Sequence, residues 1–385
     1  MRGPAAARET ATAVVIAGGG TGGHLYPGLA VARELLRREP GAQVSFAGTA
    51  RGLEARVIPN EGLPLDLIRS AGLKGKSLMT RLRGAALVPL GFADAWRLLS
   101  RRRPDVVVGV GGYSSGPVVL AAALRGIATM VLEQNAAPGL TNRLLAPWVR
   151  AAAVTYAQAL PFFRGRGFVT GNPVRAEFFV VADAAPAADP ASGPRRVLIL
   201  GGSQGAHAIN LAMVAAAPEL ARREPGVFIV HQTGNRDLAD VREGYTRGGV
   251  AADASAFVDA VAREMSAADL VICRAGATTL AELAAMGRGA VLIPFPAATD
   301  DHQRKNAQVL VDAGAAVMVE ERDLTGAKLA DVAAALLADR PRRQAMGQAM
   351  RAFARPDAAA RIVDRLLALA GRSGAAGAGE RGAAS

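Results

Sequence analysis

Two stretches far apart in the chain share one pattern, and this pattern restricts the fold more than any other feature. They are VVIAGGGTGGH at residues 14–24 and VLILGGSQGAH at residues 197–207. Each is an apolar run typical of a strand, followed by a glycine-rich loop, a histidine and a helical pattern. A loop of this kind lets the backbone approach a ligand and directs the free N–H groups of a helix N-terminus toward it, usually toward an anion. The near-repeat therefore predicts two similar α/β domains.

The rest of the sequence alternates short apolar runs with helical patterns. A chain of 385 residues exceeds what one hydrophobic core usually supports, so we expect two domains. The predicted strands are residues 14–17, 44–47, 106–110, 129–132, 152–155, 197–200, 227–231, 256–258, 270–273, 291–294 and 316–319. This alternation predicts two doubly wound, Rossmann-like parallel sheets with helices on both faces, and a ligand between the domains at the carboxyl ends of the strands.

Composition gives the domain boundaries. Residues 1–180 form the predicted N-terminal domain and residues 197–342 the C-terminal domain. The Ala-, Pro- and Asp-rich residues 181–196 are predicted to be a linker, and the Gly- and Ala-rich residues 371–385 a disordered tail.

Charge and cysteine content restrict the partners and the compartment. The net charge of +12 favours an acidic partner, which could be nucleic acid, an anionic membrane or a phosphate-bearing ligand. Aromatic residues make up only 4% of the chain, whereas a nucleic-acid-binding protein would use aromatic side chains to stack bases. A single cysteine, Cys273, excludes a disulfide framework and fits a reducing compartment. The opening residues lack the apolar core of a signal peptide, and no apolar run is long enough to span a bilayer.

The first glycine loop is a weak match to both common nucleotide-binding motifs. Gly18, Gly20 and Gly23 fit G-x-G-x-x-G, but no acidic residue ends the second predicted strand to hold a ribose, and no Gly-Lys-Ser/Thr follows. What remains is a loop with free amides, the Thr21 hydroxyl and the His24 imidazole. Histidine is suited to accept a proton near neutral pH, so His24 is a candidate general base; the alternative is a capping or packing role.

The loops of the second half carry further polar candidates. Ser203 and the amides after Gly202 could hold a diphosphate at a helix N-terminus, whereas His207 is expected to be structural. Glu282 could accept both hydroxyls of a ribose, but Thr279-x-x-Glu282 also fits a capping box.

Three more residues are placed to touch a ligand. Gln303 could hydrogen-bond a sugar or lie in a solvated turn, and Asn135 could contact a ligand or be a plain turn residue. Arg175 could bind a phosphate. No Asp-x-Asp motif occurs, so we expect neither a metal nor a cofactor, with helix termini and Arg175 stabilising a leaving diphosphate.

These loops together resemble one protein family. GGTGGH, GGYSSGP, EQN, GNPVR, GGSQGA, CRAGATTLAE and DHQRKNA occur in this order, and the sequence resembles the MurG family of bacterial glycosyltransferases from about residue 13 to about residue 369. The resemblance implies the two-domain GT-B fold, with two Rossmann-like domains facing a cleft. The N-terminal domain would take the lipid acceptor and the C-terminal domain the sugar nucleotide, and helices within residues 343–369 would pack back on the N-terminal domain.

The resemblance also implies the reaction. N-acetylglucosamine would move from UDP-N-acetylglucosamine to the muramyl 4-hydroxyl of undecaprenyl-diphospho-muramyl-pentapeptide, in one inverting displacement during peptidoglycan synthesis. It places the protein on the cytoplasmic face of the bacterial cell membrane as a peripheral protein, with cell-wall and division proteins as further partners and no nucleic acid. His24 would be the catalytic base. The substrate-binding residues would be Thr21, Gly22, Gly23, Asn135, Arg175, Ser203, Val258 (through its backbone, to uracil), Ala277, Thr278, Thr279, Leu280, Ala281, Glu282 and Gln303.

A lipid acceptor requires a membrane-facing surface, and residues 74–103 are the best candidate. This stretch mixes basic and apolar residues without the length to span a bilayer, which is typical of a segment lying on an anionic leaflet. The predicted contacts are Lys74, Lys76, Leu78, Met79, Arg81, Leu82 and Trp96. The alternative is an ordinary helix face packed on the core, in which case the enzyme could be a GT-B glycosyltransferase with a soluble acceptor.

Overall fold

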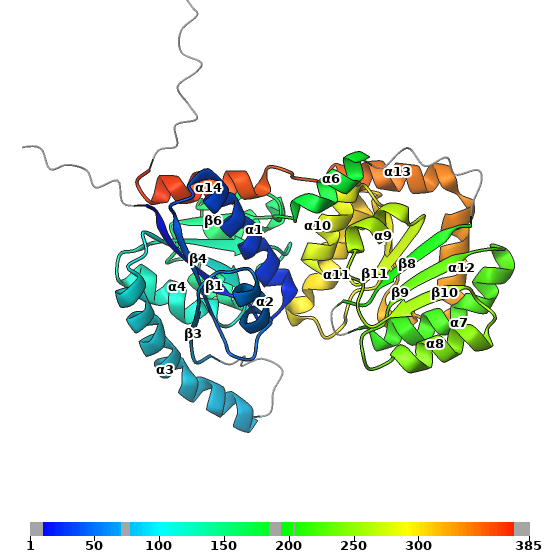
Figure 1. The fold of residues 1–385 in the computed structure, drawn as a ribbon, viewed down its shortest axis with the longest axis horizontal. Helices are drawn as coiled ribbons and strands as arrows, with labels where there is room; N and C mark the ends of the chain where they lie inside the picture. Colours follow the sequence, from blue (N-terminus) through cyan, green and yellow to red (C-terminus); the bar gives the residue numbers. More distant parts are fainter. Residues whose placement is uncertain (1–10, 71–77, 185–193, 203–204, 373–385) are drawn as a thin grey trace, which may run out of the picture. The chain divides into compact units, whose positions relative to one another are not determined.

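The computed structural model describes residues 11–70, 78–184, 194–202 and 205–372, of which residues 78–88, 183 and 184 are described in their backbone alone. The chain divides into two compact units (Figure 1). The first unit contains residues 1–133, 138–170 and 357–385, and the second unit contains residues 134–137 and 171–356.

The first unit is an α/β sandwich. Its strands are β1 (Ala13–Gly18), β2 (Gln43–Gly48), β3 (Leu65–Leu67), β4 (Val106–Gly111), β5 (Ala128–Glu133), β6 (Ala151–Val154) and β7 (Gly167–Val169). Its helices are α1 (Gly22–Arg38), α2 (Glu54–Asn60), α3 (Leu78–Arg102), α4 (Ser115–Leu124), α5 (Leu140–Leu145), the 3₁₀ helix η1 (Ala157–Phe163) and α14 (Ala358–Leu369).

The second unit repeats this design. Its strands are β8 (Arg196–Leu200), β9 (Phe228–Gln232), β10 (Ala252–Ser255), β11 (Leu270–Cys273), β12 (Ala290–Leu292) and β13 (Ala316–Met318). Its helices are α6 (Ala176–Ala184), α7 (His207–Arg223), α8 (Leu238–Arg247), α9 (Val261–Ala267), α10 (Ala277–Met286), η2 (Thr299–Asp301), α11 (His302–Asp312), η3 (Glu321–Asp323), α12 (Gly326–Ala338) and α13 (Arg340–Arg351).

Both sheets are parallel and doubly wound, as the sequence predicts. Within the described residues the strand order is β3-β2-β1-β4-β5-β6-β7 in the first unit and β10-β9-β8-β11-β12-β13 in the second. The strand order reverses between β1 and β4 in one sheet and between β8 and β11 in the other. Ligands of such sheets bind outside the carboxyl ends of the strands at this switch point, so we expect a ligand beside the loops that follow these four strands.

Alternation along the strands divides each core into two layers. In β1, Val14 and Ile16 pack with α1 and α14, whereas Val15 and Ala17 face α3 and α4 on the other side of the sheet. The second unit divides in the same way, with α7, α8 and α12 on one face and α6, α9, α10 and α11 on the other. Because both faces are covered, the central strands are continuous apolar runs, which is why the sequence predicts them so clearly.

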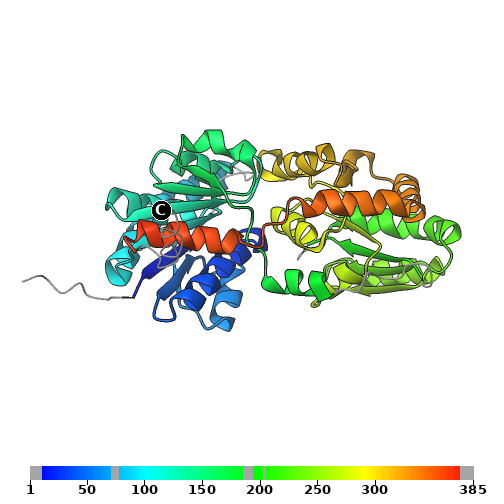
Figure 2. The ribbon, with the colours of Figure 1, turned by 90° about the horizontal axis from the view of Figure 1, so that it is seen from above.

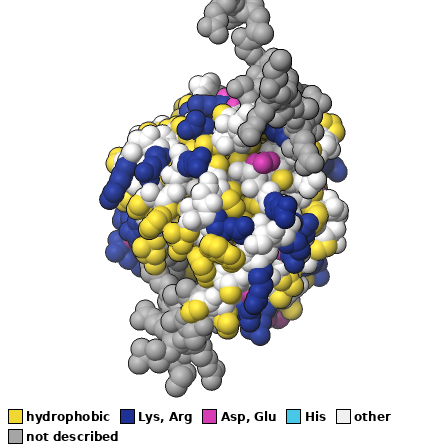
Figure 3. Space-filling view, turned by 90° about the vertical axis from the view of Figure 1, so that its left-hand side faces the viewer, with side chains coloured by type: hydrophobic (Ala, Val, Ile, Leu, Met, Phe, Trp, Pro, Cys, Tyr) yellow, Lys and Arg dark blue, Asp and Glu magenta, His cyan; other side chains and the backbone are white. Residues whose placement is uncertain are grey.

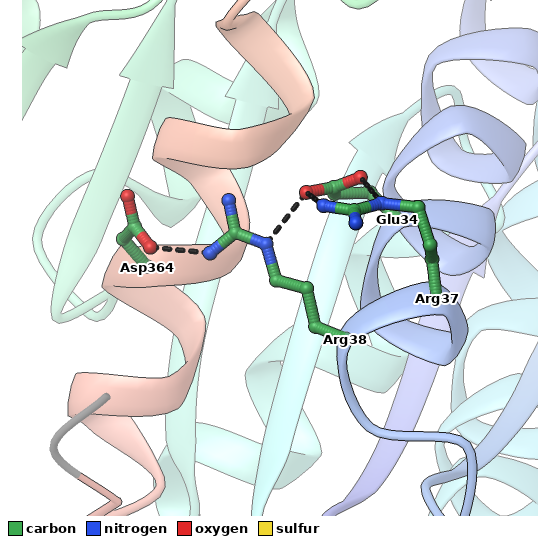
Figure 4. Close-up of polar contacts among 4 residues, drawn as sticks. All are labelled: Glu34, Arg37, Arg38 and Asp364. Carbon is green, nitrogen blue, oxygen red and sulfur yellow. Dashed lines mark hydrogen bonds and ion pairs between the residues drawn. The ribbon is translucent and has the colours of Figure 1, made fainter. Parts of the chain in front are cut away.

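Helix α14 returns to the first unit and packs beside α1 (Figures 1 and 2). Its buried residues Ile362, Val363 and Leu366 join the core that α1 covers. At the surface Arg38 of α1 joins both Glu34 on its own helix and Asp364 on α14 (Figure 4). The Glu34 pKa is lowered, chiefly by its hydrogen bond with Arg37. Exposed ion pairs add little free energy, so the buried apolar residues hold α14 in place.

Some boundaries differ from those predicted. Residues 256–258 are not a strand, because β10 lies at the preceding residues 252–255, an edge strand whose sequence ADAS is too polar to be recognised. The short strands β3 and β7 were not predicted.

The domain boundaries also differ from those predicted. Residues 181–184 belong to α6 rather than to the linker, and residues 171–180 lie in the second unit. Helix α13 contacts α10 and α12, so α14 is the part of residues 343–369 that packs on the first unit. Residues 373–385, the predicted tail, lie outside the described residues.

Candidate functional site

At the switch point of the first unit, two glycine loops follow β1 and β4. Gly18, Gly19 and Gly20 have φ values of 141°, 145° and 85°, and Gly111 and Gly112 have values of 98° and 78°. Residues other than glycine rarely adopt these backbone conformations. The two loops also touch, because a Cβ at Gly112 would lie 2.7 Å from the Gly19 carbonyl oxygen. The glycines therefore let the two loops pack backbone against backbone.

His24 lies in the first turn of α1, against the second of these loops. Its Nδ1 is 3.2 Å from the Thr21 hydroxyl, and a Cβ at Gly111 would lie 2.6 Å from His24 Cδ2 and 2.9 Å from Nε2. If the Thr21 oxygen accepts the hydrogen on Nδ1, then Nε2 carries the lone pair and can act as a base. Thr21 is the exposed N-cap residue of α1, and Gly22 and Gly23 are its first two residues.

The amides of the first loop are not all free, contrary to the sequence-based expectation. The Gly20 N–H donates to Glu54 Oε2 at 2.7 Å, and the backbone N–H and hydroxyl of Thr49 both donate to Glu54 Oε1, at 2.9 and 3.1 Å. Glu54 is completely buried, and a Cβ at Gly19 would lie 2.4 Å from its carboxylate. This carboxylate, supplied by α2, ties the loop after β1 to the loop after β2.

In the second unit, the loop after β11 leads into α10, which carries Glu282. The helix begins at Ala277 with Gly276 as its N-cap residue, so Thr279 is the third helical residue and cannot be the N-cap of a capping box. The capping-box interpretation of Glu282 is therefore wrong. The other predicted nucleotide-lining residues, Ala277, Thr278, Thr279, Leu280 and Ala281, form the first turns of this helix.

Arg175 lies beside Glu282. Its Nη2 is 3.5 Å from Glu282 Oε1, its Nη1 is 3.0 Å from Glu177, and its guanidinium lies 5.0 Å from the Phe178 ring centre. Burial raises the pKa of Glu282 to about 7, and the charge of Arg175 opposes this rise. The pair presents one cation, suited to a phosphate, and one carboxylate, suited to hydroxyl groups.

Asn135 belongs to the second unit rather than to the first, and hydrogen bonds with α11 hold it there. Asn306 donates to Asn135 Oδ1 at 3.1 Å and accepts from the Ala136 N–H at 2.8 Å. Gln303, on the first turn of the same helix, accepts from the Phe295 N–H at 3.0 Å. The turn before α11 places Asp300 and Asp301 at φ values of 56° and 57°, a strained conformation that clusters at ligand sites.

The loop after β8 is described except at Ser203, which with residue 204 lies outside the described residues. Val258 is buried, and its N–H donates to the side chain of Gln232 at 3.0 Å. His207, expected to be structural, contacts Asp237 at 2.9 Å through Nδ1.

Sequence reasoning missed Glu54, Asn306 and Gln232. Asn306 lies within the motif DHQRKNA, which did carry a signal, whereas nothing local marks Glu54 or Gln232. Of the predicted membrane contacts, Lys74 and Lys76 lie outside the described residues, and Leu78, Met79, Arg81 and Leu82 lie on α3 without described side chains. Trp96 is described and is 43% exposed.

Two features are absent from the described residues. No three His, Cys, Asp or Glu side chains in the described ranges gather closely enough to hold a metal ion. None of the described helices is both long and apolar enough to cross a membrane.

Comparisons with known proteins give consistent matches along the chain. The model of the glycosyltransferase family 28 N-terminal domain matches residues 14–154, and that of the family 28 C-terminal domain matches residues 196–362. The UDP-N-acetylglucosamine--N-acetylmuramyl-(pentapeptide) pyrophosphoryl-undecaprenol N-acetylglucosamine transferase of Anaeromyxobacter sp. (strain K) is 48% identical over 360 residues, which cover 93% of each chain. The protein of the same name from Myxococcus xanthus (strain DK1622) is 46% identical over 352 residues, 91% of each chain.

Solved structures agree with the sequence matches. The crystal structure of Acinetobacter baumannii MurG has a TM-score of 0.75 at 31% identity, and the match covers 93% of this chain and 99% of that one. CalG4, the calicheamicin glycosyltransferase, has a TM-score of 0.65 at 17% identity over 94% of this chain and 99% of its own, a likeness of fold alone.

Proposed function

The chain belongs to glycosyltransferase family 28, and on that premise we propose that it transfers N-acetylglucosamine from UDP-N-acetylglucosamine to an undecaprenyl-linked N-acetylmuramyl-pentapeptide. The observation that carries this proposal in the structure is the pair of Arg175 and buried Glu282 at the carboxyl edge of the second sheet. A nucleoside diphosphate presents phosphates and ribose hydroxyls, and this pair matches both in charge and hydrogen-bonding capacity.

The remaining donor contacts follow the same division of chemistry. The N-terminus of α10 and the glycine loop after β8 direct backbone N–H groups and the positive end of a helix dipole toward the phosphates. Gln303 accepts a backbone hydrogen bond through its oxygen, so its NH₂ group is the part that donates to the sugar. Asn135, held by Asn306, is the second sugar contact.

The reaction is a single displacement. The muramyl 4-hydroxyl oxygen bonds to the anomeric carbon of N-acetylglucosamine, the bond from that carbon to the diphosphate oxygen breaks, and UDP leaves with the electron pair. The hydroxyl proton passes to His24 Nε2, and attack from the face opposite UDP inverts the anomeric configuration. Arg175 and the helix N-termini stabilise the departing charge, so we propose that the active site needs no divalent ion.

Transfer of labelled sugar tests the proposal directly. We expect purified protein to transfer N-acetylglucosamine from UDP-N-acetylglucosamine to a lipid-linked muramyl-pentapeptide, to use UDP-glucose poorly, and to keep its activity in excess chelator. Transfer to a soluble sugar but not to the lipid-linked acceptor would point to a different glycosyltransferase. Loss of activity in chelator with recovery in Mg²⁺ would contradict the metal-independent mechanism.

We also propose that the helical layer α3–α4–α5 of the first unit faces an anionic membrane. Exposed apolar side chains occur along this layer and just beyond it, namely Leu90, Trp96, Leu124, Leu140, Leu144 and Trp148. Arg125 lies over the Trp96 ring at 5.0 Å, and Arg97 and Arg101 are exposed on the same helix as Trp96. Figure 3 shows an end face of the first unit where hydrophobic side chains gather with Lys and Arg around them. A patch of this kind suits a lipid surface with acidic headgroups.

Replacing both Leu90 and Trp96 with Glu should weaken binding to phosphatidylglycerol vesicles by about tenfold or more, because two apolar contacts are lost and two like charges are added. Leu211→Glu is the matched control, since Leu211 is 56% exposed but lies on α7 of the second unit. Flotation or sedimentation with vesicles measures both. Equal loss in the two variants, or no loss in the first, would contradict this surface.

A further inference from the structure

Gln232, the last residue of β9, uses both ends of its side-chain amide inside the second unit. Its Nε2 donates to the Gly202 carbonyl oxygen at 2.8 Å, and its Oε1 accepts from the Val258 N–H at 3.0 Å. The residue is 4% exposed, so water does not readily replace either bond. No sequence motif marks it, and the reaction described above does not use it.

The two partners of Gln232 belong to different ligand-facing segments. Gly202 lies in the glycine loop after β8, at the switch point of the sheet, where the proposed function places the phosphates. Val258 lies in the segment after β10, where the resemblance to the MurG family implies a backbone contact to uracil. Strand β9 lies between β8 and β10 in the sheet, so a side chain at its carboxyl end can reach both neighbours. Gln232 therefore joins the phosphate side of the site to the base side.

A buried network fixes the other side of the glycine loop. Asn210, near the start of α7, donates to the Thr233 carbonyl oxygen at 2.9 Å and to Asp237 at 2.8 Å, and its oxygen lies 3.0 Å from His231 Nε2. The Asn210 oxygen can only accept, so His231 Nε2 carries the hydrogen and Nδ1 accepts from the Tyr245 hydroxyl at 2.7 Å. Burial keeps His231 neutral by lowering its pKa to about 3. The start of α7 is thus anchored to the turn after β9, next to Gln232.

We propose that Gln232 is a positioning residue that sets the spacing between the diphosphate loop and the base-binding segment, and so determines affinity for the sugar nucleotide. This inference rests on the proposed function. It predicts that loss of either hydrogen bond weakens binding of UDP-N-acetylglucosamine as a whole, because base and diphosphate then no longer fit their two segments together. The chemical step, which depends on the sugar and the acceptor, is affected much less.

The chemistry of the amide allows a sharp test. A carboxylate at this position can accept from Val258 but cannot donate to Gly202, whereas a protonated carboxyl group can do both. We expect Gln232→Glu to raise the KM for UDP-N-acetylglucosamine by about tenfold at pH 8, with kcat and the acceptor KM changed less than about twofold. The ratio of its KM to that of the unchanged protein should fall toward one as the pH is lowered, and comparison at each pH cancels the titration of Glu282.

Gln232→Met, which has similar size and neither donates nor accepts strongly, should show the same increase in KM at every pH. Gln308→Glu on α11 is the control and should match the unchanged protein. Circular dichroism melting at each pH separates a folding defect from a binding defect, because a buried carboxyl group also makes stability depend on pH. A KM ratio for Gln232→Glu near one at pH 8, or one that does not change with pH, would overturn the inference. If the unchanged protein neither binds UDP nor transfers the sugar, the proposed function itself has failed.

Discussion

His24→Ala is expected to lower kcat by about 10²–10⁴-fold while the KM for UDP-N-acetylglucosamine changes little, because the variant lacks the general base but keeps the donor-binding residues of the second unit. The geometry assigns the basic lone pair to Nε2 when Nδ1 donates to the Thr21 hydroxyl. Steady-state kinetics with lipid-linked acceptor measure this effect. Turnover within about threefold of the unchanged protein would remove His24 from the chemistry.

Two further variants separate catalysis by His24 from simple packing. Thr21→Val removes the oxygen that faces Nδ1 and should lower kcat, but less than His24→Ala does, because the imidazole remains. Gly111→Ala places a methyl group 2.6 Å from His24 Cδ2 on a backbone with φ of 98°, so the ring must shift. We expect both to lower kcat. Gly111→Ala should preserve the donor KM, whereas Thr21→Val should also raise it somewhat, because Thr21 is a predicted substrate-binding residue. A rise in donor KM alone would indicate a binding role for this loop.

Glu54→Ala should lower the free energy of unfolding by about 3 kcal/mol or more, since two backbone N–H groups and a hydroxyl lose a buried, charged acceptor. The cavity left by a completely buried side chain adds to the loss. At temperatures where the variant stays folded, activity should still fall, because the loop before Thr21 and His24 is no longer held. Denaturant unfolding and transfer assays measure the two effects.

Conservative and control variants make this prediction specific. Glu54→Gln keeps one acceptor but points N–H groups at existing donors, so it should also destabilise the protein, by about 1–3 kcal/mol. Glu61→Gln, whose partner Arg33 is more than half exposed, should change stability by less than about 1 kcal/mol. If Glu54→Gln proved as harmless as Glu61→Gln, the carboxylate would not be what holds the glycine loop.

The sequence by itself determined the elements whose signal is local. The runs at residues 14–17 and 197–200 are buried on both faces and followed by glycines, so composition alone predicts strands and loops there. The edge strand β10 was misplaced because an edge strand needs few apolar residues, and its sequence ADAS gives no pattern. Glu282 was found as a candidate, but its local sequence taken alone favoured a capping box, which the start of α10 at Ala277 excludes.

Only the tertiary structure decided which polar groups support the candidate site. Glu54 comes 34 residues after Gly20, Gln232 joins the segments that follow β8 and β10, and Asn306 holds Asn135 across 171 residues of sequence. Local propensity carries information about the nearest few neighbours along the chain, whereas these hydrogen bonds depend on which strands lie side by side and where each one ends. For that reason the loops and their chemistry could be predicted from the residues, and the side chains that hold those loops could not.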